Sequence, residues 1–248
     1  ERAVKVTWQL PGGVTAEGRQ PTLPLLPPGR HDLKVQVEEL GLISLYDNLD
    51  SVVYPAEFHV PTVESGDEVE FAVTGQPLHE VSIYYFADLS AMTAAERSAV
   101  TGELRIYRND GPTYPGLQSR TPGTLLYTSQ PFRLNSGYFL QRFTDLNVQT
   151  TDRITWTVVW NNLPQISGKT AGLIVGDVKQ NPAPTNRGKS YNDFWVHEGD
   201  RWELLHLGDF RPVANFATRA TAVGADIALK SEVFAFTLTV TNTAPVLA

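Results

Sequence analysis

Alternation of apolar and polar residues with a period of two dominates the chain. The clearest runs are "VKVTWQL" (4–10), "RITWTVVWN" (153–161) and "EVFAFTLTVT" (232–241). This period places successive side chains on opposite faces of a strand, so each run predicts a β-strand. Further runs with the same pattern lie at 33–37, 67–75, 79–87, 102–109, 124–129, 170–176 and 214–223. The pattern therefore predicts an all-β chain.

Turn-forming residues separate these runs. "NDG" (109–111), "TPG" (121–123) and "NSG" (135–137) are typical examples, since Gly, Pro, Asn and Asp each favour tight turns. One helical candidate remains, "SAMTAAERSA" (90–99), which either Ser90 or Thr93 could cap. Many short strands without alternating helices favour an antiparallel β-sandwich, jelly-roll-like, with at most one short helix.

A Pro- and Gly-rich segment at 10–30 interrupts the pattern near the N-terminus. We expect residues 1–32 to form a strand and a Pro/Gly-rich segment that packs on the sandwich. Residues 33–241 would form the β-sandwich domain, and residues 242–248 would begin a C-terminal linker. A boundary inside 10–30 would leave a piece too small to fold alone, so a single domain is expected.

Composition narrows the choice of partners and compartment. The 248 residues include only 19% charged residues, carry a net charge of −7 and contain no cysteine. The lack of a basic run argues against a nucleic-acid partner, and no apolar run is long enough for membrane insertion. Disulfides, thiolate zinc sites and cysteine nucleophiles are excluded.

The expected compartment follows from the same composition. Low charge together with abundant Thr, Val, Gly and Pro favours an exported protein that is secreted or held at the cell surface. No charged-then-apolar leader opens the chain, so we expect either a cytosolic protein or an exported one whose leader has been removed.

Seven segments occur in an order that is characteristic of a known kind of domain. They are "LYDNLDS" (45–51), "ELRIYRNDGP" (103–112), "PGTLLYTS" (122–129), "ITWTVVWNNL" (154–163), "AGLIVG" (171–176), "GKSYNDFW" (188–195) and "NFATRATAV" (215–223). Together they resemble an uncharacterised β-sandwich domain of secreted, surface-sorted (PEP-CTERM-like) modular bacterial proteins, over roughly residues 42–223. The resemblance implies export and a β fold, and it assigns no catalytic residue.

The C-terminal stretch carries a second resemblance. "TLTVTNTAPVLA" (237–248) resembles the joint that opens immunoglobulin-like or cadherin-like repeats in long secreted proteins. This implies neighbouring domains of that kind in the full-length chain.

The aromatic-rich stretch "YNDFWVHEGDRWELL" (191–205) predicts a hairpin and leaves two interpretations open. In the favoured one, Trp202 and either Phe194 or Trp195 anchor the core. In the other, an exposed tryptophan stacks on a sugar ring beside hydrogen-bonding side chains. The ligand contacts would then be Tyr191, Asn192, Asp193 and Trp195, with Tyr114 from the loop 108–123. Trp156 and Trp160 present the same choice, and core is again favoured.

Acidic turns suggest a metal site. Asp47, Asn48 and Asp50 offer the hard oxygen ligands that suit a structural Ca²⁺ ion, although Asp and Asn are also ordinary turn residues. No other cofactor is expected.

For function, the composition and the resemblances favour a non-catalytic extracellular module. Its role would be glycan binding, or adhesion and spacing, in a larger secreted or cell-surface protein, and its partners would be glycans or other surface components. The alternative is a polysaccharide-active enzyme that uses a carboxylate pair, which 27 acidic residues allow. No Gly-x-Ser-x-Gly elbow or phosphate-binding glycine loop supports another chemistry.

Overall fold

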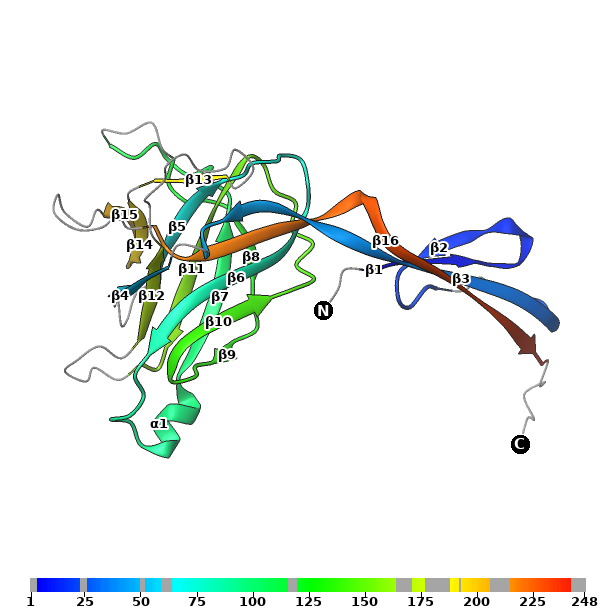
Figure 1. Ribbon diagram of the computed structural model, residues 1–248, viewed down its shortest axis with the longest axis horizontal. Helices are drawn as coiled ribbons and strands as arrows, with labels where there is room; N and C mark the ends of the chain where they lie inside the picture. The colour runs from blue at the N-terminus through cyan, green and yellow to red at the C-terminus, as the bar shows by residue number, and fades with distance from the viewer. Residues whose placement is uncertain are drawn as a thin grey trace. The chain divides into compact units, whose positions relative to one another are not determined.

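The computed structural model forms two compact units (Figure 1). Unit 1 combines Glu1–Leu42 with Val223–Ala248, and unit 2 is Ile43–Ala222. The structure describes residues 4–22, 26–49, 52–58, 64–115, 120–163, 171–176, 188–191, 193–205 and 215–241, with only the backbone at 52–58 and 225–230. This division differs from the predicted boundary after residue 32, and the predicted packing of residues 1–32 on the sandwich stays a prediction.

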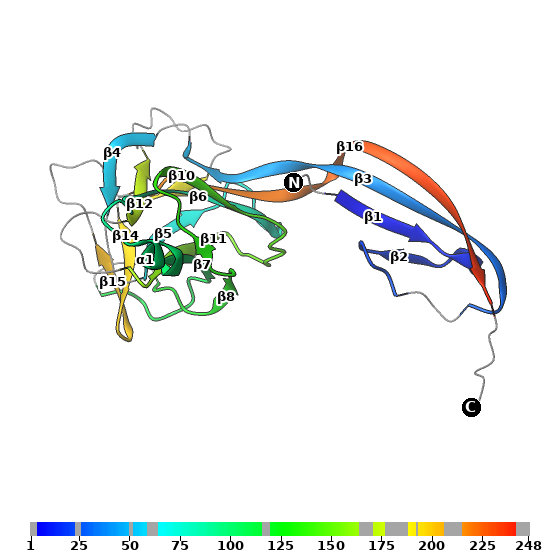
Figure 2. The same ribbon diagram turned by 90° about the horizontal axis from the view of Figure 1, so that it is seen from below.

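Unit 1 is a sheet with the strand order β2-β1-β3-β16 (Figure 2). Its elements are β1 (Val4–Gln9), a 3-10 turn η1 (Pro11–Gly13), β2 (Thr15–Glu17), and the parts of β3 (Gly29–Asp47) and β16 (Thr218–Val240) that belong to this unit. β1 pairs antiparallel with both β2 and β3. Thr237 Oγ1 on β16 donates to Asp32 Oδ1 on β3 at 3.0 Å.

Unit 2 consists of two antiparallel sheets that face each other across a core. In sheet A, β6 lies between β10 on one side and β16 and β12 on the other. Its strands within the unit are β10 (Gly137–Phe143), β6 (Leu78–Ala87), β12 (Ala171–Gly176), β4 (Val52–Phe58) and the ends of β3 and β16.

Sheet B carries the candidate site and has the order β15-β14-β5-β11-β7-β8, with β13 paired to β5 and β9 to β7. Its described strands all pair antiparallel. Its strands are β5 (Glu64–Glu70), β7 (Thr101–Tyr107), β8 (Leu125–Thr128), β9 (Phe132–Arg133), β11 (Arg153–Asn161), β13 (Lys189–Ser190), β14 (Phe194–Glu198) and β15 (Arg201–Leu205).

The core lies between the sheets, and its largest side chains are aromatic. Trp156 from sheet B packs edge-on against Phe216, with ring centroids 6.3 Å apart, and Trp160 packs against Tyr85 of sheet A at 6.0 Å. Trp156 and Trp160 are buried, which confirms the favoured interpretation of both. Across the described residues, two antiparallel sheets with a single short α-helix confirm the predicted all-β sandwich.

The local predictions differ in accuracy. The strand predicted at 153–161 is β11 itself, and α1 (Ala94–Ala99) lies inside the predicted helical segment. Thr93 caps α1 by a reciprocal box: its Oγ1 accepts from Glu96 N, and Glu96 Oε2 accepts from Thr93 N. By contrast, the two strands predicted at 214–223 and 232–241 both overlap the single long strand β16.

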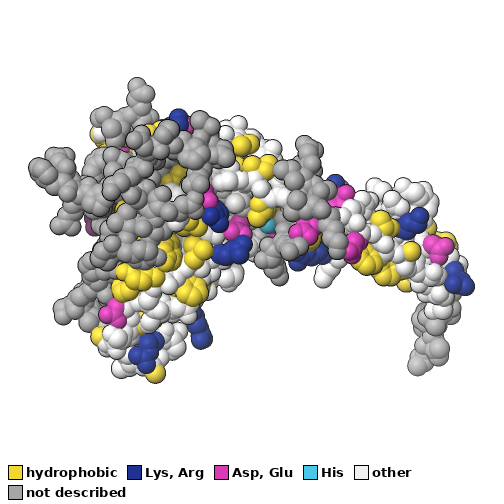
Figure 3. Space-filling view, viewed as in Figure 1, with side chains coloured by type: hydrophobic (Ala, Val, Ile, Leu, Met, Phe, Trp, Pro, Cys, Tyr) yellow, Lys and Arg dark blue, Asp and Glu magenta, His cyan; other side chains and the backbone are white. Residues whose placement is uncertain are grey.

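The outer faces of the two sheets have opposite character. On sheet A, Tyr138 of β10 packs against Phe86 and Tyr84 of β6, and Figure 3 shows hydrophobic side chains gathered over these strands. The rings are tilted by 49° and 42°, so they do not form one flat surface for a sugar to stack on. The outer face of sheet B is polar, and it holds the groups that could bind a polar ligand.

Candidate functional site

Strand β5 places carboxylates on the outer face of sheet B. Val69 and Asp67 of "ESGDEVE" point towards the core side, and the period of two therefore puts Glu64, Glu68 and Glu70 on the opposite face. Glu64 and Glu68 are only 5% and 4% exposed. Burying a carboxylate costs free energy unless the charge is paired, so these two residues need partners on the outer face.

Glu68 is held by one side chain from the neighbouring strand β11 and one from the end of β7, the next strand in the sheet. Arg153 Nη1 on β11 lies 2.8 Å from Glu68 Oε1, and Asn109 Nδ2, just after β7, donates to Glu68 Oε2 at 2.9 Å. The same Asn109 Nδ2 lies 2.9 Å from Thr155 Oγ1. Burial raises the pKa of Glu68, and the positive charge of Arg153 acts in the opposite direction. Glu68 thereby fixes the orientation of Arg153 and Asn109.

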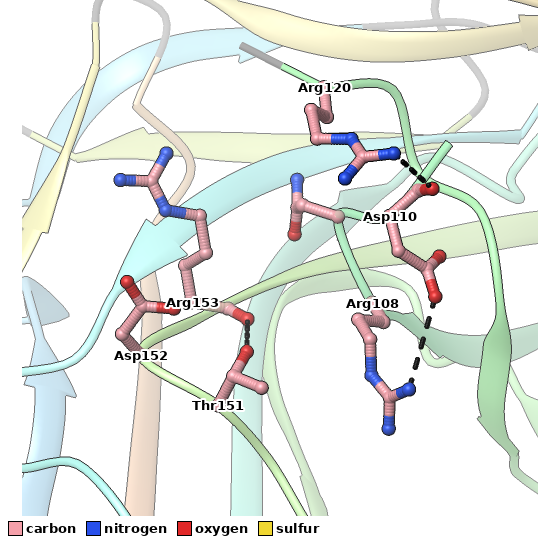
Figure 4. A pocket seen from close by; sticks show the side chains of 7 residues that line it. Arg108, Asp110, Arg120, Thr151, Asp152 and Arg153 are labelled. Atoms are coloured by element: carbon pink, nitrogen blue, oxygen red, sulfur yellow. Dashed lines mark hydrogen bonds and ion pairs between the residues drawn. The ribbon is translucent and has the colours of Figure 1, made fainter. Parts of the chain in front are cut away.

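Arg153 and Asn109 line a pocket of about 420 Å³ (Figure 4). The wall is formed where β7 ends, where β11 begins, and by Arg120 from the β7–β8 connection. Its residues are Arg108, Asn109, Asp110, Arg120, Thr151, Asp152 and Arg153. Every one of them has a polar or charged side chain, so the pocket suits a polar ligand.

The connection between β7 and β8 is held in place by Asp110. Its Oδ1 accepts from the backbone N–H of Thr124 and its Oδ2 from the Thr124 hydroxyl, each at 2.7 Å. The bond from the Thr124 backbone lowers the pKa of Asp110, which keeps the carboxylate ionised. A Cβ at Gly123 would collide with Asp110 Oδ1, so glycine is required for this close approach.

The arginines of the pocket differ in how their charges are balanced. Arg153 faces Glu68 and, at 3.5 Å, Glu70. Arg108 lies 3.9 Å from Asp110. Arg120 donates to two backbone carbonyl oxygens, Gly111 O at 2.9 Å and Asp110 O at 3.1 Å. Within the described part of the chain, no carboxylate forms an ion pair with Arg120.

A second polar cluster surrounds Glu64 on the same face. Glu64 accepts from Arg105 Nη1 at 2.9 Å, Tyr107 Oη at 2.7 Å and Thr157 Oγ1 at 2.5 Å. His197 Nδ1 lies 3.5 Å from its Oε2. These groups belong to four consecutive strands of sheet B, so Glu64 links β5 to β14 on one side and to β11 and β7 on the other.

The predicted hairpin of β14 and β15 is confirmed, with Phe194 in the core and Trp195 on the opposite face. Trp202 was expected in the core, and that expectation is wrong. It lies half-buried on the outer face, stacked on His197 with ring centroids 4.4 Å apart and an interplanar angle of 18°. His197 and Trp202 are register partners, so the antiparallel ladder places them together.

The structure brings some of the predicted ligand contacts together. Tyr114 packs edge-on against Trp195, with ring centroids 5.5 Å apart, but Trp195 is only 1% exposed and offers no open face to a sugar. Tyr191 is 44% exposed, and its hydroxyl donates to Glu70 Oε2 at 3.3 Å. Asp193 is half-buried, and Asn192 lies outside the described residues.

The predicted calcium ligands are engaged in other contacts. Asp47 Oδ2 pairs with Arg219 Nε at 2.7 Å, and Asp47 Oδ1 accepts from Leu49 N at 3.0 Å. Asn48 Oδ1 accepts from Thr218 N at 2.7 Å, while Asp50 lies outside the described residues. Over the ranges that the structure covers, no group of three or more His, Asp or Glu side chains could hold a metal ion. The calcium site stays a prediction, and these contacts give it no support.

The sequence did not predict the pocket. Its local signal was the pair of acidic residues Glu68 and Glu70, which alternate along β5 and both contact Arg153. Comparison with protein-family models, curated proteins and solved structures finds no match to this chain. None of the helices in the described ranges is both long and apolar enough to cross a membrane.

Proposed function

We propose that the chain is a non-catalytic module of a larger secreted or cell-surface bacterial protein, and that it binds a glycan in the pocket lined by Arg108, Arg120 and Arg153. The observation that carries the proposal is the pocket itself. A volume of about 420 Å³ falls in the range of about 300–1,000 Å³ typical of small-ligand sites. Guanidinium, carboxylate, amide and hydroxyl groups on its wall match the hydroxyl groups of a sugar.

Rigid support strengthens the proposal. The buried carboxylate of Glu68 holds Arg153 and Asn109, and Thr124 fixes Asp110 at the opposite wall. Binding then orders few side chains, which lowers its entropic cost.

An exposed aromatic ring lies on the same outer face. Tyr191 Oη and Arg153 Nη2 both contact Glu70 Oε2, at 3.3 Å and 3.5 Å. An exposed tyrosine next to an arginine could contact the apolar side of a sugar ring while the arginine bonds its hydroxyl groups. Tyr191 therefore enters the proposal, whereas Trp195, which is buried on the same face against Tyr114, offers no open ring.

The alternative, a polysaccharide-active enzyme, needs two available carboxylates facing each other across the substrate. The pocket is lined by two, Asp110 and Asp152. Both oxygens of Asp110 accept hydrogen bonds from Thr124, so the described lining leaves only Asp152 available for acid or base chemistry. The geometry favours binding over turnover.

A glycan array followed by titration calorimetry tests the proposal. The substitution Arg108→Ala removes a pocket side chain, and Arg133→Ala on β9 is the matched control because Arg133 is exposed and does not line the pocket. We expect Arg108→Ala to weaken binding by about tenfold and Arg133→Ala to leave it unchanged. Absence of any glycan ligand, or equal effects of both substitutions, would refute the proposal. Release of reducing ends from a polysaccharide would favour the enzyme.

A further inference from the structure

The arginines of the pocket differ in their partners, and Arg120 differs from the other two. The lining contains three arginines and two aspartates, and Glu68 beneath it supplies a third carboxylate. Arg153 is neutralised from beneath by Glu68, and Arg108 faces Asp110 at 3.9 Å. Arg120 meets only the backbone oxygens of Gly111 and Asp110 among the residues that the structure describes.

These two backbone bonds fix the guanidinium of Arg120 without neutralising it. A guanidinium has five N–H donors, and the carbonyl oxygens occupy its Nε and one Nη atom. Donors therefore remain for a further acceptor, and Figure 4 shows the side chain lying over the pocket near Asp110. A planar, oriented guanidinium binds an anionic group through two parallel hydrogen bonds.

Hydrogen-bond acceptors stand on the other side of the same pocket. The exposed side chains of Thr151 and Asp152 line it, and the backbone of Arg153 accepts from Thr151 Oγ1 at 3.2 Å. Asn109 Oδ1 is buried and has no hydrogen-bond partner. Oxygen atoms of this kind accept from hydroxyl groups, so the pocket combines one cationic wall with a wall that suits neutral polar groups.

We infer that the ligand is an acidic saccharide, whose anionic substituent binds Arg120 and whose ring hydroxyl groups contact Thr151 and Asp152. The inference rests on the proposed glycan-binding function and names the class of glycan. A carboxylate and a sulfate ester share the required chemistry, because both present acceptor oxygens and a negative charge to the guanidinium. A neutral saccharide would leave the charge of Arg120 without an anionic partner.

Titration calorimetry with matched oligosaccharides tests the inference on the intact chain. The ligands are a tri-galacturonate, its fully methyl-esterified form and a sulfated trisaccharide, so the first two share their rings and differ in charge. We expect the free acid to bind about tenfold to a hundredfold more tightly than the ester, as expected for loss of a charge-assisted hydrogen-bonded pair. Binding of the sulfated sugar without the uronate would identify the anionic group as sulfate.

Two arginine variants locate the effect. Arg120→Gln should abolish the preference for the acid over the ester, and Arg133→Gln, with the same charge change on exposed β9, should preserve it. Added salt should weaken binding of the acid more than binding of the ester, because exposed charges are screened. Equal affinity for acid and ester would overturn the inference and leave glycan binding in place. Failure of every saccharide to bind would overturn both proposals, and equal losses in the two variants would attribute the preference to general surface charge.

Discussion

Arg153 Nη1 lies 2.8 Å from the carboxylate of Glu68, which is 4% exposed, and this pair joins strands β5 and β11 beneath the pocket. The Arg153 side chain is about one-third exposed, at 32%. The Glu68 end of the pair is therefore buried, and the Arg153 end reaches the surface of the pocket. Its contribution should be larger than that of a surface ion pair and smaller than that of a fully buried one.

Removing Arg153 should destabilise unit 2 because it leaves Glu68 buried without its positive partner. We expect Arg153→Ala to lower the free energy of unfolding by about 2–3 kcal/mol, measured by urea denaturation. Adding Glu68→Gln should recover part of the loss, since an amide carries no charge to bury. A double variant that is less stable than Arg153→Ala would contradict this account.

Trp195 and Tyr191 should respond oppositely to substitution. Trp195 is 1% exposed, so Trp195→Ala should cost about 3–5 kcal/mol of stability, as for other truncated buried aromatics. Tyr191 is 44% exposed, and Tyr191→Ala should change stability by less than about 0.5 kcal/mol while weakening saccharide binding. Thermal unfolding and calorimetry measure the two effects. A stable Trp195→Ala variant with impaired binding would restore Trp195 as a direct ligand contact.

Patterns within short stretches of sequence predicted individual elements of this fold, such as the strand β11 and the start of helix α1. The alternation in 153–161 predicted β11 to the residue, because apolar side chains face the core at every second position while threonines take the opposite face. The capping residue of α1 was one of the two expected, since Thr93 precedes a run of helix formers.

The pocket could not be predicted in the same way because its contacts are distant in sequence. Glu68 and Asn109 are 41 positions apart, and Glu68 and Arg153 are 85 apart. No local period identifies which strand lies beside which, so these partners become visible only with the order of sheet B. The prediction for Trp202 was wrong for a related reason. Alternation along a strand assigns residues to two faces, but it does not show that side chains on the outer face can also be partly buried.

Glu80 and Arg142 should make stability depend on acidic pH. Burial alone would raise the pKa of Glu80, but hydrogen bonds from Arg142 and Ser82 outweigh burial and lower the pKa below its usual value. A carboxyl group with a lowered folded-state pKa stabilises the fold above its unfolded pKa, and this contribution disappears as the pH falls through the folded pKa.

Arg142→Gln should therefore reduce stability near neutral pH by about 1 kcal/mol, a modest value because half of the Arg142 side chain is exposed. The difference between wild type and variant should shrink as the pH is lowered from about 5 to about 3. Thermal melting across this range measures it, with Arg133→Gln as the control for charge. A difference that stays constant with pH would show that the ion pair is not its source.

Asp67 should have the opposite effect, because it is a carboxyl group buried on the core side of β5. Its Oδ2 accepts from Ser190 Oγ at 2.9 Å and Phe216 N at 3.2 Å, and its Oδ1 is buried without a partner. Burial raises its pKa well above the usual value. The folded state then favours the protonated form, so this group's effect on stability becomes unfavourable as the pH rises from the unfolded pKa towards the folded pKa.

Asp67→Asn should relieve this cost while keeping an oxygen that accepts from Ser190 and Phe216. We expect the melting temperature to rise near neutral pH by several degrees, since about 1 kcal/mol corresponds to about 2–4 °C in a domain of this size. Below about pH 3 the two proteins should melt together, because Asp67 is then largely protonated whether folded or unfolded. Asp200→Asn, in the exposed turn between β14 and β15, makes the same charge change at the surface and should have little effect. A lower melting temperature of Asp67→Asn near neutral pH would contradict this account.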